Sequence, residues 1–244
     1  MIILSAGMPR AGSGWFYNLT HDLMVACGSQ DARYIRDRYH LKSILTEVNC
    51  NIGALTLRRL TAVMLPSILG NTFVIKTHAA PTLYAQRLIN RSLLQPTYIY
   101  RDPRDAMLSA FENGQRAREA DRQNAFSNLI DFDTTLQFMM DYLRVWESWM
   151  QCKQALKVRY EDFLFDYSTQ TDRLLEFLNL NNYESGIPGI LDQYLPKSVQ
   201  NDQRGLHFSR GITGRFRQVM TADQQDIMAE TFAPYLERMG YEPV

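Results

Sequence analysis

The chain has 244 residues, of which 45% are hydrophobic and 21% charged, a composition typical of a globular protein with one large core. Its 26 basic and 26 acidic residues cancel, which argues against a general nucleic-acid-binding protein, because such proteins carry a clear basic excess. No apolar run approaches the roughly 20 residues needed to cross a bilayer, so we expect no membrane span.

The cysteines and the N-terminal sequence indicate the compartment in which the protein is expected. Cys27, Cys50 and Cys152 are scattered and odd in number, which favours free thiols in a reducing compartment. The chain begins Met1-Ile2-Ile3-Leu4, without the basic segment of a signal peptide. We therefore expect a cytoplasmic protein.

The first predicted element is a short buried strand over residues 1–6, followed by the loop Gly7-Met8-Pro9-Arg10-Ala11-Gly12-Ser13-Gly14-Trp15. Apolar residues at helical spacing come next and end near Gly28. A strand, a glycine-rich turn and a helix in this order form an anion cradle, because backbone N–H groups and the helix dipole point into the turn. The nucleoside-triphosphatase pattern has Lys and then Ser/Thr after its second glycine, whereas Ser13 and Gly14 stand there. The loop therefore suits a phosphate without a magnesium-bound triphosphate, and we expect no metal.

The rest of the chain alternates between helices and strands. Strands are predicted at 72–78, 95–101 and 155–159, and helices at 51–69, 81–94, 132–153, 168–180 and from Thr221 onward. Asp102 and Pro103 have the chemistry of a helix N-cap and first helical residue, Pro81 is expected near the start of its helix, and Thr221 with Gln224 forms a capping-box pattern. Residues 113–128 are expected to be a polar surface connection and residues 181–208 irregular. The alternation predicts one α/β domain over residues 1–244, with three layers and helices on both faces of a mostly parallel sheet, similar to the P-loop nucleoside triphosphatases.

Polar motifs follow three of the predicted strands: the Gly7–Trp15 loop, Lys76-Thr77-His78, and Arg101-Asp102-Pro103-Arg104-Asp105 with Ser109. The carboxyl ends of parallel strands are where open α/β sheets collect ligand-binding residues. Tyr160-Glu161-Asp162 and Arg210-Gly211-Ile212-Thr213-Gly214 add two later motifs.

In this order the motifs resemble those of the sulfotransferases that use 3′-phosphoadenosine 5′-phosphosulfate (PAPS) and release 3′,5′-ADP (PAP). The family's Pro-Lys-Ser-Gly-Thr-Thr-Trp loop corresponds to residues 9–15, its Lys-Thr-His to residues 76–78, and its Arg-Asn/Asp-Pro-Arg/Lys-Asp-x-x-x-Ser to residues 101–109. The resemblance extends over nearly the whole chain. It implies transfer of a sulfuryl group from PAPS to a hydroxyl of a phenol, alcohol, glycoside or lipid.

The resemblance also implies roles for individual residues. His78 would be the general base, and Arg10 and Lys76 would stabilise the leaving oxygen. The 5′-phosphate would be held by the loop, comprising Pro9, Arg10, Ala11, Gly12, Ser13 and Gly14, with Trp15 stacked on the adenine. The 3′-phosphate would be held by Arg101, Ser109, Arg210 and Gly211, with Tyr160 against the adenine. Arg10 stands where the family has lysine, and a guanidinium grips phosphate but hands over no proton.

Several alternatives stay open at this stage. Trp15 could be a core residue, His78 a structural histidine, and Arg104 with Asp105 a surface ion pair. The whole chain could be a kinase on a degenerate P-loop or a catalytically silent nucleotide-binding protein. Candidate acceptor walls are residues 34–40, 79–84, 139–140 and 181–208. The family's dimerisation pattern survives only as Arg217, Thr221, Ala222 and Asp226, so the oligomeric state stays undecided.

Overall fold

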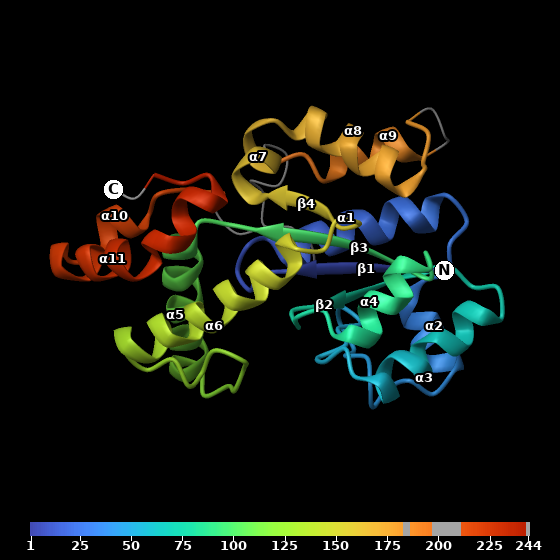
Figure 1. Ribbon diagram of the computed structural model, residues 1–244, viewed down its shortest axis with the longest axis horizontal. Helices are drawn as coiled ribbons and strands as arrows, with labels where there is room; N and C mark the ends of the chain where they lie inside the picture. The colour runs from blue at the N-terminus through green and yellow to red at the C-terminus, as the bar shows by residue number, and fades with distance from the viewer. Residues whose placement is uncertain (183–185, 197–210, 243–244) are drawn as a thin grey trace.

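The structure, a computed structural model, describes residues 1–182, 186–196 and 211–242. A parallel sheet in the order β2-β1-β3-β4 forms its centre (Figure 1). The strands are β1 (Ile2–Gly7), β2 (Phe73–Thr77), β3 (Leu94–Tyr100) and β4 (Leu156–Arg159). These bounds confirm the four strands expected from the sequence.

One face of the sheet is covered by helices α1 (Ser13–Ala26), α7 (Tyr160–Phe165), α8 (Tyr167–Leu178) and α9 (Ile187–Gln193) (Figure 1). Ile3 of β1 packs here with Val74, Ile99 and Val158 of the other strands. The sheet contributes alternate residues to each face because successive strand side chains point in opposite directions.

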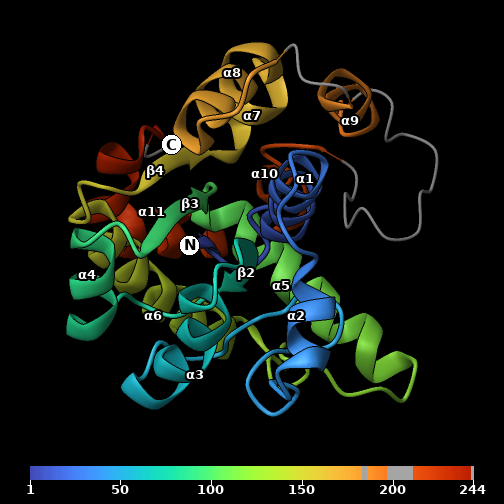
Figure 2. The same cartoon turned by 90° about the vertical axis from the view of Figure 1, so that its right-hand side faces the viewer.

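The other face packs against α2 (Ala32–Arg38), α3 (Leu57–Ile68), α4 (Leu83–Asn90), α5 (Pro103–Glu119), α6 (Phe132–Met150) and α11 (Ala222–Met239), with the short α10 (Phe216–Val219) beside them (Figures 1 and 2). Ile2 and Leu4 of β1 belong to this core. Tyr98 of β3 stacks on Trp149 of α6, with ring centroids 5.7 Å apart. The three-layer α/β architecture is thus confirmed.

Local sequence signals set several helix ends correctly. The Asp102 side chain accepts a hydrogen bond from the backbone N–H of Arg104, with Pro103 at the start of α5. Thr221 and Gln224 form a complete capping box at α11. Such caps satisfy N–H groups that the first helical turn leaves without partners.

Other boundaries were predicted wrongly. Helix α3 begins at Leu57 rather than near residue 51, capped by Thr56, and α4 begins at Leu83, capped by Thr82 rather than starting at Pro81. Helix α5 continues to Glu119, into the stretch expected to be a connection. Helix α9 lies within 181–208, whose residues 183–185 and 197–208 lie outside the described part. The error at α3 has a visible cause: Ile52 and Leu55 are buried core residues, so their apolar spacing favours a helix although they precede the helix start.

No helix in the described part of the chain combines the length and apolar character that a bilayer crossing requires. The parallel strands all end at the same edge of the sheet, where β1 leads into α1 and β3 into α5. The polar motifs of the sequence follow these strand ends and so meet at this edge.

Candidate functional site

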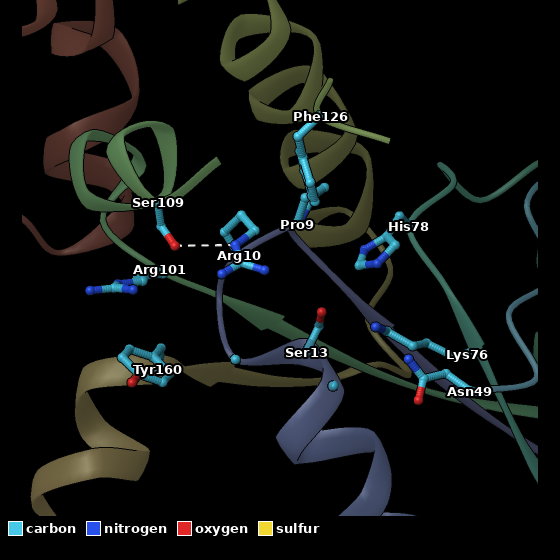
Figure 3. Close-up of a pocket in the computed structure, with 12 residues that line it drawn as sticks. Pro9, Arg10, Ser13, Asn49, Lys76, His78, Arg101, Ser109, Phe126 and Tyr160 are labelled. Atoms are coloured by element: carbon cyan, nitrogen blue, oxygen red, sulfur yellow. Dashed lines mark hydrogen bonds between the residues drawn. The ribbon is translucent and has the colours of Figure 1, made fainter. Parts of the chain in front are cut away.

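A cavity of about 220 Å³ opens at the carboxyl edge of the sheet (Figure 3). Its lining comes from six separate stretches of chain: Pro9, Arg10, Gly12, Ser13, Gly14, Asn49, Lys76, His78, Arg101, Ser109, Phe126 and Tyr160. Ten of these residues were predicted for the site from the sequence. Asn49 and Phe126 were not, and none of residues 34–40, 79–84 or 139–140, the expected acceptor walls, lines this cavity.

The loop after β1 aims the start of α1 at the cavity. Arg10 and Gly12 take positive φ angles of 64° and 72°, which reverse the chain before α1 begins at Ser13. A Cβ on Gly12 would lie 2.8 Å from the Tyr160 ring, so only glycine fits both the angle and the space. Within the described residues no side chain caps α1, and its first turn presents backbone N–H groups and a partial positive charge to the cavity.

Arg10 extends from this loop to α5. Its Nε donates a hydrogen bond to Ser109 Oγ at 3.1 Å, drawn as a dashed line in Figure 3. Its guanidinium lies over the Phe126 ring, 5.6 Å from the centroid. Burial and the charges of Arg116 and Arg101 lower the pKa of Arg10, which marks this side of the cavity as strongly positive.

Lys76 is a buried cation at the end of β2, with 6% of its surface exposed. Burial, assisted by the nearby charge of Arg10, lowers its pKa to about 8. Figure 3 shows its ammonium group directed toward Ser13. An anion bound between Lys76 and the start of α1 would compensate both positive charges.

His78 is held in one tautomer. Its Nδ1 lies 2.6 Å from the carbonyl oxygen of Gly7, and a carbonyl can only accept, so Nδ1 carries the proton. The lone pair is then on Nε2. Burial and the charge of Lys76 lower the pKa of His78 to about 3, so the ring is neutral at physiological pH. A neutral imidazole with an unprotonated Nε2 can accept a proton.

Arg101 forms the far end of the cavity. Its Nη2 donates to the Ile212 carbonyl at 2.7 Å and to Asp105 at 3.3 Å, and the group lies over the Tyr160 ring at 4.8 Å. Its Nε is buried, has no hydrogen-bond partner within the described residues, and lies 3.9 Å from Glu161 Oε1, within ion-pair distance. The Arg101 guanidinium is thus oriented by two carboxylates, those of Asp105 and Glu161, at the edge of the cavity.

A smaller cavity of about 40 Å³ shares this end, lined by Arg101, Asp105, Ser109, Tyr160, Gly211, Ile212 and Arg215. Asp105 fixes the late segment here, because it accepts hydrogen bonds from the backbone N–H groups of Gly214 at 2.6 Å and Phe216 at 3.2 Å. Arg215 adds a two-bond ion pair with Glu112 at 3.0 and 2.6 Å. The predicted residue Gly211 is thereby brought to Arg101 and Ser109.

The sequence analysis missed the role of Asp105. Arg104 and Asp105 do not form a surface pair: Arg104 is buried against Asp102 and stacks on Phe216, whereas Asp105 faces Arg101 and residue 214. The sequence contains one indication of this role, which is that an acidic residue, Asp105, stands two positions after Pro103 in the motif. The backbone groups of Gly214 and Phe216 that it binds lie more than one hundred residues away and could not be found from local spacing.

Trp15, predicted to stack on the adenine, does not line the cavity. The indole has no exposed surface, donates from Nε1 to the Tyr194 carbonyl at 3.2 Å, and packs edge-on against Phe163 at 5.1 Å. Trp15 is therefore a core residue that supports the loop from behind. Ala11 is also fully buried, and its N–H donates to the Met8 carbonyl, so it shapes the loop without facing the cavity. Arg210 lies outside the described residues.

Residues 2–240 match the sulfotransferase domain family. The chain is a member of the sulfotransferase family. Solved structures agree in fold. The chain is similar to mouse sulfotransferase SULT7A1 complexed with PAP, with a TM-score of 0.61 and 15% identity, over 97% of this chain and 84% of that one. It is also similar to retinol dehydratase in complex with retinol and PAP (TM-score 0.64, 18% identity, 97% of this chain and 81% of that one) and in complex with androsterone and PAP (TM-score 0.63, 19% identity, 97% of this chain and 80% of that one). A search of curated proteins finds no match.

The site generates a prediction about Asp105. Replacing Asp105 by Ala in this sulfotransferase should lower the free energy of unfolding by about 1.5–3 kcal/mol, because two buried N–H groups and Arg101 lose a charged acceptor. Urea denaturation measures the change. The matched control is Asp141→Ala, whose exposed pair with Arg144 should contribute less than about 1 kcal/mol. Equal effects of the two substitutions would contradict the anchoring role of Asp105.

Proposed function

We propose that this sulfotransferase uses PAPS to sulfate a hydroxyl group of a small molecule, with His78 as the general base. The observation that carries the proposal is His78 itself, neutral and fixed with its free Nε2 beside Lys76, in the same cavity as the start of α1. This arrangement combines a proton acceptor with preorganised positive charge, as sulfuryl transfer requires.

The described residues fit the two phosphate groups of PAPS at opposite ends of the cavity. The first-turn N–H groups of α1, Ser13 and Arg10 suit the 5′-phosphosulfate. The Arg101 guanidinium suits the 3′-phosphate, together with Ser109, whose hydroxyl accepts from Arg10 and keeps its own proton for donation. Gly211 lies at that end, and Tyr160 covers it. The PAP-bound sulfotransferase and retinol dehydratase structures support this choice of ligand by analogy of fold.

PAPS, when bound, supplies a sulfuryl group on a phosphate leaving group. His78 Nε2 takes the proton of the acceptor hydroxyl, while Nδ1–H remains on the Gly7 carbonyl and keeps the ring oriented. Lys76 and Arg10 stabilise charge on the oxygens around the breaking bond. Lys76, with a pKa of about 8, can also give a proton to the leaving oxygen, whereas Arg10 contributes charge only.

Ligand-dependent stability tests the nucleotide. PAP at 100 times its Kd should raise the free energy of unfolding by about 2.7 kcal/mol, as expected for a ligand that binds only the folded state. Calorimetric melting with PAP and with ATP plus magnesium measures it. Replacing Arg101 by Ala should abolish most of the PAP effect. Stabilisation by ATP with magnesium but not by PAP would instead favour a kinase.

Replacing His78 by Asn tests the base. The Asn amide keeps a donor for the Gly7 carbonyl but has no proton acceptor of imidazole strength, so turnover should fall by about 10²–10⁴-fold. The affinity for PAP, measured by titration calorimetry, should stay near the wild-type value. The exposed His40, which has a positive φ that Asn tolerates, provides the control His40→Asn. Turnover retained in His78→Asn would contradict a base role, and would leave PAP binding as a separate result.

The lowered pKa of Lys76 predicts a pH dependence of binding. The free protein loses the Lys76 charge as pH rises through about 8, and bound PAP raises that pKa again, so binding at pH 8–9 should take up protons. Calorimetry in buffers of different ionisation enthalpy measures the uptake. Lys76→Arg, which stays charged, should bind PAP with no uptake from this residue.

A second pH dependence concerns His78, whose pKa in the free protein is about 3. The value of kcat/KM for PAPS, which reports the free protein, should therefore show no fall between pH 7 and 5 from His78 protonation. An acid limb near pH 6.5 that His78→Asn removes would contradict this.

A further inference from the structure

The residues that follow α11 return to the sheet and reach the Arg101 end of the cavity from behind. Helix α11 ends at Met239, and Gly240 follows in the left-handed conformation, with a φ of 80°. The backbone N–H of Tyr241 then donates to the Leu236 carbonyl at 2.9 Å. This turn ends the helix and brings the Tyr241 side chain to α7. None of these residues belongs to the motifs from which the site was predicted.

Two arginines from the carboxyl edge of the sheet hold the backbone of this turn. Arg159, the last residue of β4, donates from Nη1 to the Gly240 carbonyl at 2.7 Å, and its guanidinium lies 5.5 Å from the centre of the Tyr241 ring. Arg104, near the start of α5, donates from Nη2 to the Glu242 carbonyl at 2.9 Å. Tyr241 is therefore placed by contacts on both sides of it in sequence.

The Tyr241 hydroxyl is bonded to a buried carboxylate. It donates to Glu161 Oε2 at 2.5 Å, whereas Glu161 Oε1 accepts from the backbone N–H of Asp102 at 3.4 Å and lies 3.9 Å from Arg101 Nε. Only 12% of the Glu161 side chain is exposed. The carboxylate thus stands between Tyr241 on one side and Arg101 on the other.

The charge of Glu161 depends on these partners. Burial raises the pKa of Glu161, and the hydrogen bond from Tyr241 is the largest of the effects that lower it, ahead of the charge of Arg101. Burial and the charge of Glu161 raise the pKa of Tyr241, so its phenol stays protonated and remains a donor. The titratable and charged groups around the carboxylate are Tyr100 of β3, Arg101, Asp102 and Asp105 near the start of α5, Arg159 at the end of β4, Tyr160 and Asp162 of α7, and Tyr241.

Arg101 carries this arrangement into the cavity. Figure 3 shows its guanidinium between Ser109 and Tyr160. Its Nη2 is bonded to Ile212 and Asp105, and its Nε faces Glu161, whereas Nη1 has no partner among the described residues. A guanidinium is planar, so contacts that fix Nε and Nη2 also fix the direction of Nη1.

We propose that Tyr241 is a positioning residue for the nucleotide, because through the Glu161 carboxylate it holds the plane of the Arg101 guanidinium for the 3′-phosphate of PAPS. The effect passes through a carboxylate, and so it requires that Glu161 be ionised. This inference rests on the proposed function, since it takes a phosphate as the group that Arg101 binds.

Loss of the Tyr241 hydroxyl should make nucleotide binding depend on the charge of Glu161. In Tyr241→Phe the carboxylate loses a hydrogen bond that favours its charged form, so the pKa of Glu161 rises further and the group takes up a proton at a higher pH. A protonated Glu161 no longer attracts Arg101 Nε, so the guanidinium loses one of its two fixed corners as pH falls and regains it as pH rises. Phenylalanine keeps the ring against which Arg159 lies, so the turn stays in place.

Titration calorimetry with PAP at pH 6, 7 and 8 tests this, with the Kd of each variant divided by that of the wild type at the same pH. The division removes the pH dependence that belongs to PAP or to Lys76. For Tyr241→Phe we expect a ratio of about tenfold at pH 6 and less than about threefold at pH 8, as for loss of one hydrogen bond to a charged group. Glu161→Gln, which is never charged, should give about the same ratio at every pH. A Tyr241→Phe ratio that does not change with pH, or a Glu161→Gln ratio near one, would overturn the inference.

Tyr194 provides a matched control for the lost hydroxyl. Its O–H donates to Asp22 Oδ2 at 2.5 Å, the same bond at the same length, but against α1 and outside the cavity lining. Tyr194→Phe should lower the melting temperature about as much as Tyr241→Phe and leave the Kd ratio near one at each pH. A ratio for Tyr194→Phe that follows that of Tyr241→Phe would show a general effect on the fold and would overturn the positioning role.

Steady-state kinetics gives a second readout. At pH 6, Tyr241→Phe should raise KM for PAPS and leave kcat near the wild-type value, because the substitution acts on binding at Arg101 and leaves His78 and Lys76 unchanged. A fall in kcat with an unchanged KM would contradict the proposed role.

The outcomes separate this inference from the proposed function. If the wild type binds PAP and Tyr241→Phe binds it equally well at every pH, the role of Tyr241 is overturned and the nucleotide assignment is intact. Failure of the wild type to bind PAP would overturn the proposed function, and the role of Tyr241 with it.

Discussion

The close packing of the loop between β1 and α1 is the constraint on which the rest of the site depends. A Cβ on Gly7 would lie 2.7 Å from Ile99 Cγ2, and one on Gly12 would lie 2.8 Å from the Tyr160 ring. These two approaches let the loop lie between β3 and α7 and direct the start of α1 into the cavity. The same segment supplies the Gly7 carbonyl that orients His78. One crowded turn therefore sets both the anion cradle and the tautomer of the candidate base, while Trp15 supports it from the opposite side.

The concentration of positive charge explains the unusual electrostatics around this turn. Arg10, Lys76 and Arg101 face one cavity, whereas the nearby carboxylates, Asp105 and Glu161, lie behind Arg101 and turn toward the late segment and Tyr241. Burial is the main cause of the lowered pKa values of Lys76 and Arg10, and the neighbouring positive charges lower them further. An anionic ligand removes this cost. Binding and folding stability are therefore linked, and the affinity includes relief of repulsion among residues that the fold already holds together.

The sequence predicted what depends on local pattern. The strands followed from short apolar runs, and the starts of α5 and α11 from Asp102 with Pro103 and from the Thr221 capping box. Most motif residues were placed correctly at the strand ends, because a parallel sheet brings these ends together. The features that were missed depend on contacts between distant segments. Burial of Trp15 depends on helices α7 to α9, the anchoring role of Asp105 on residues 214–216, and the place of Tyr241 on Glu161. None of these partners is signalled by spacing along the chain.

The low pKa of His78 links the proposed base to the charge of the cavity. With a pKa of about 3 in the free protein, His78 is neutral but a weak base, because burial and the charge of Lys76 oppose protonation. The anionic groups of a bound donor would act in the opposite direction, since negative charge nearby favours the imidazolium and compensates Lys76. An anion in the cavity would therefore strengthen the proposed base, while Nδ1 of His78 stays at the Gly7 carbonyl. Electrostatics would in this way link the proposed base to the presence of the donor.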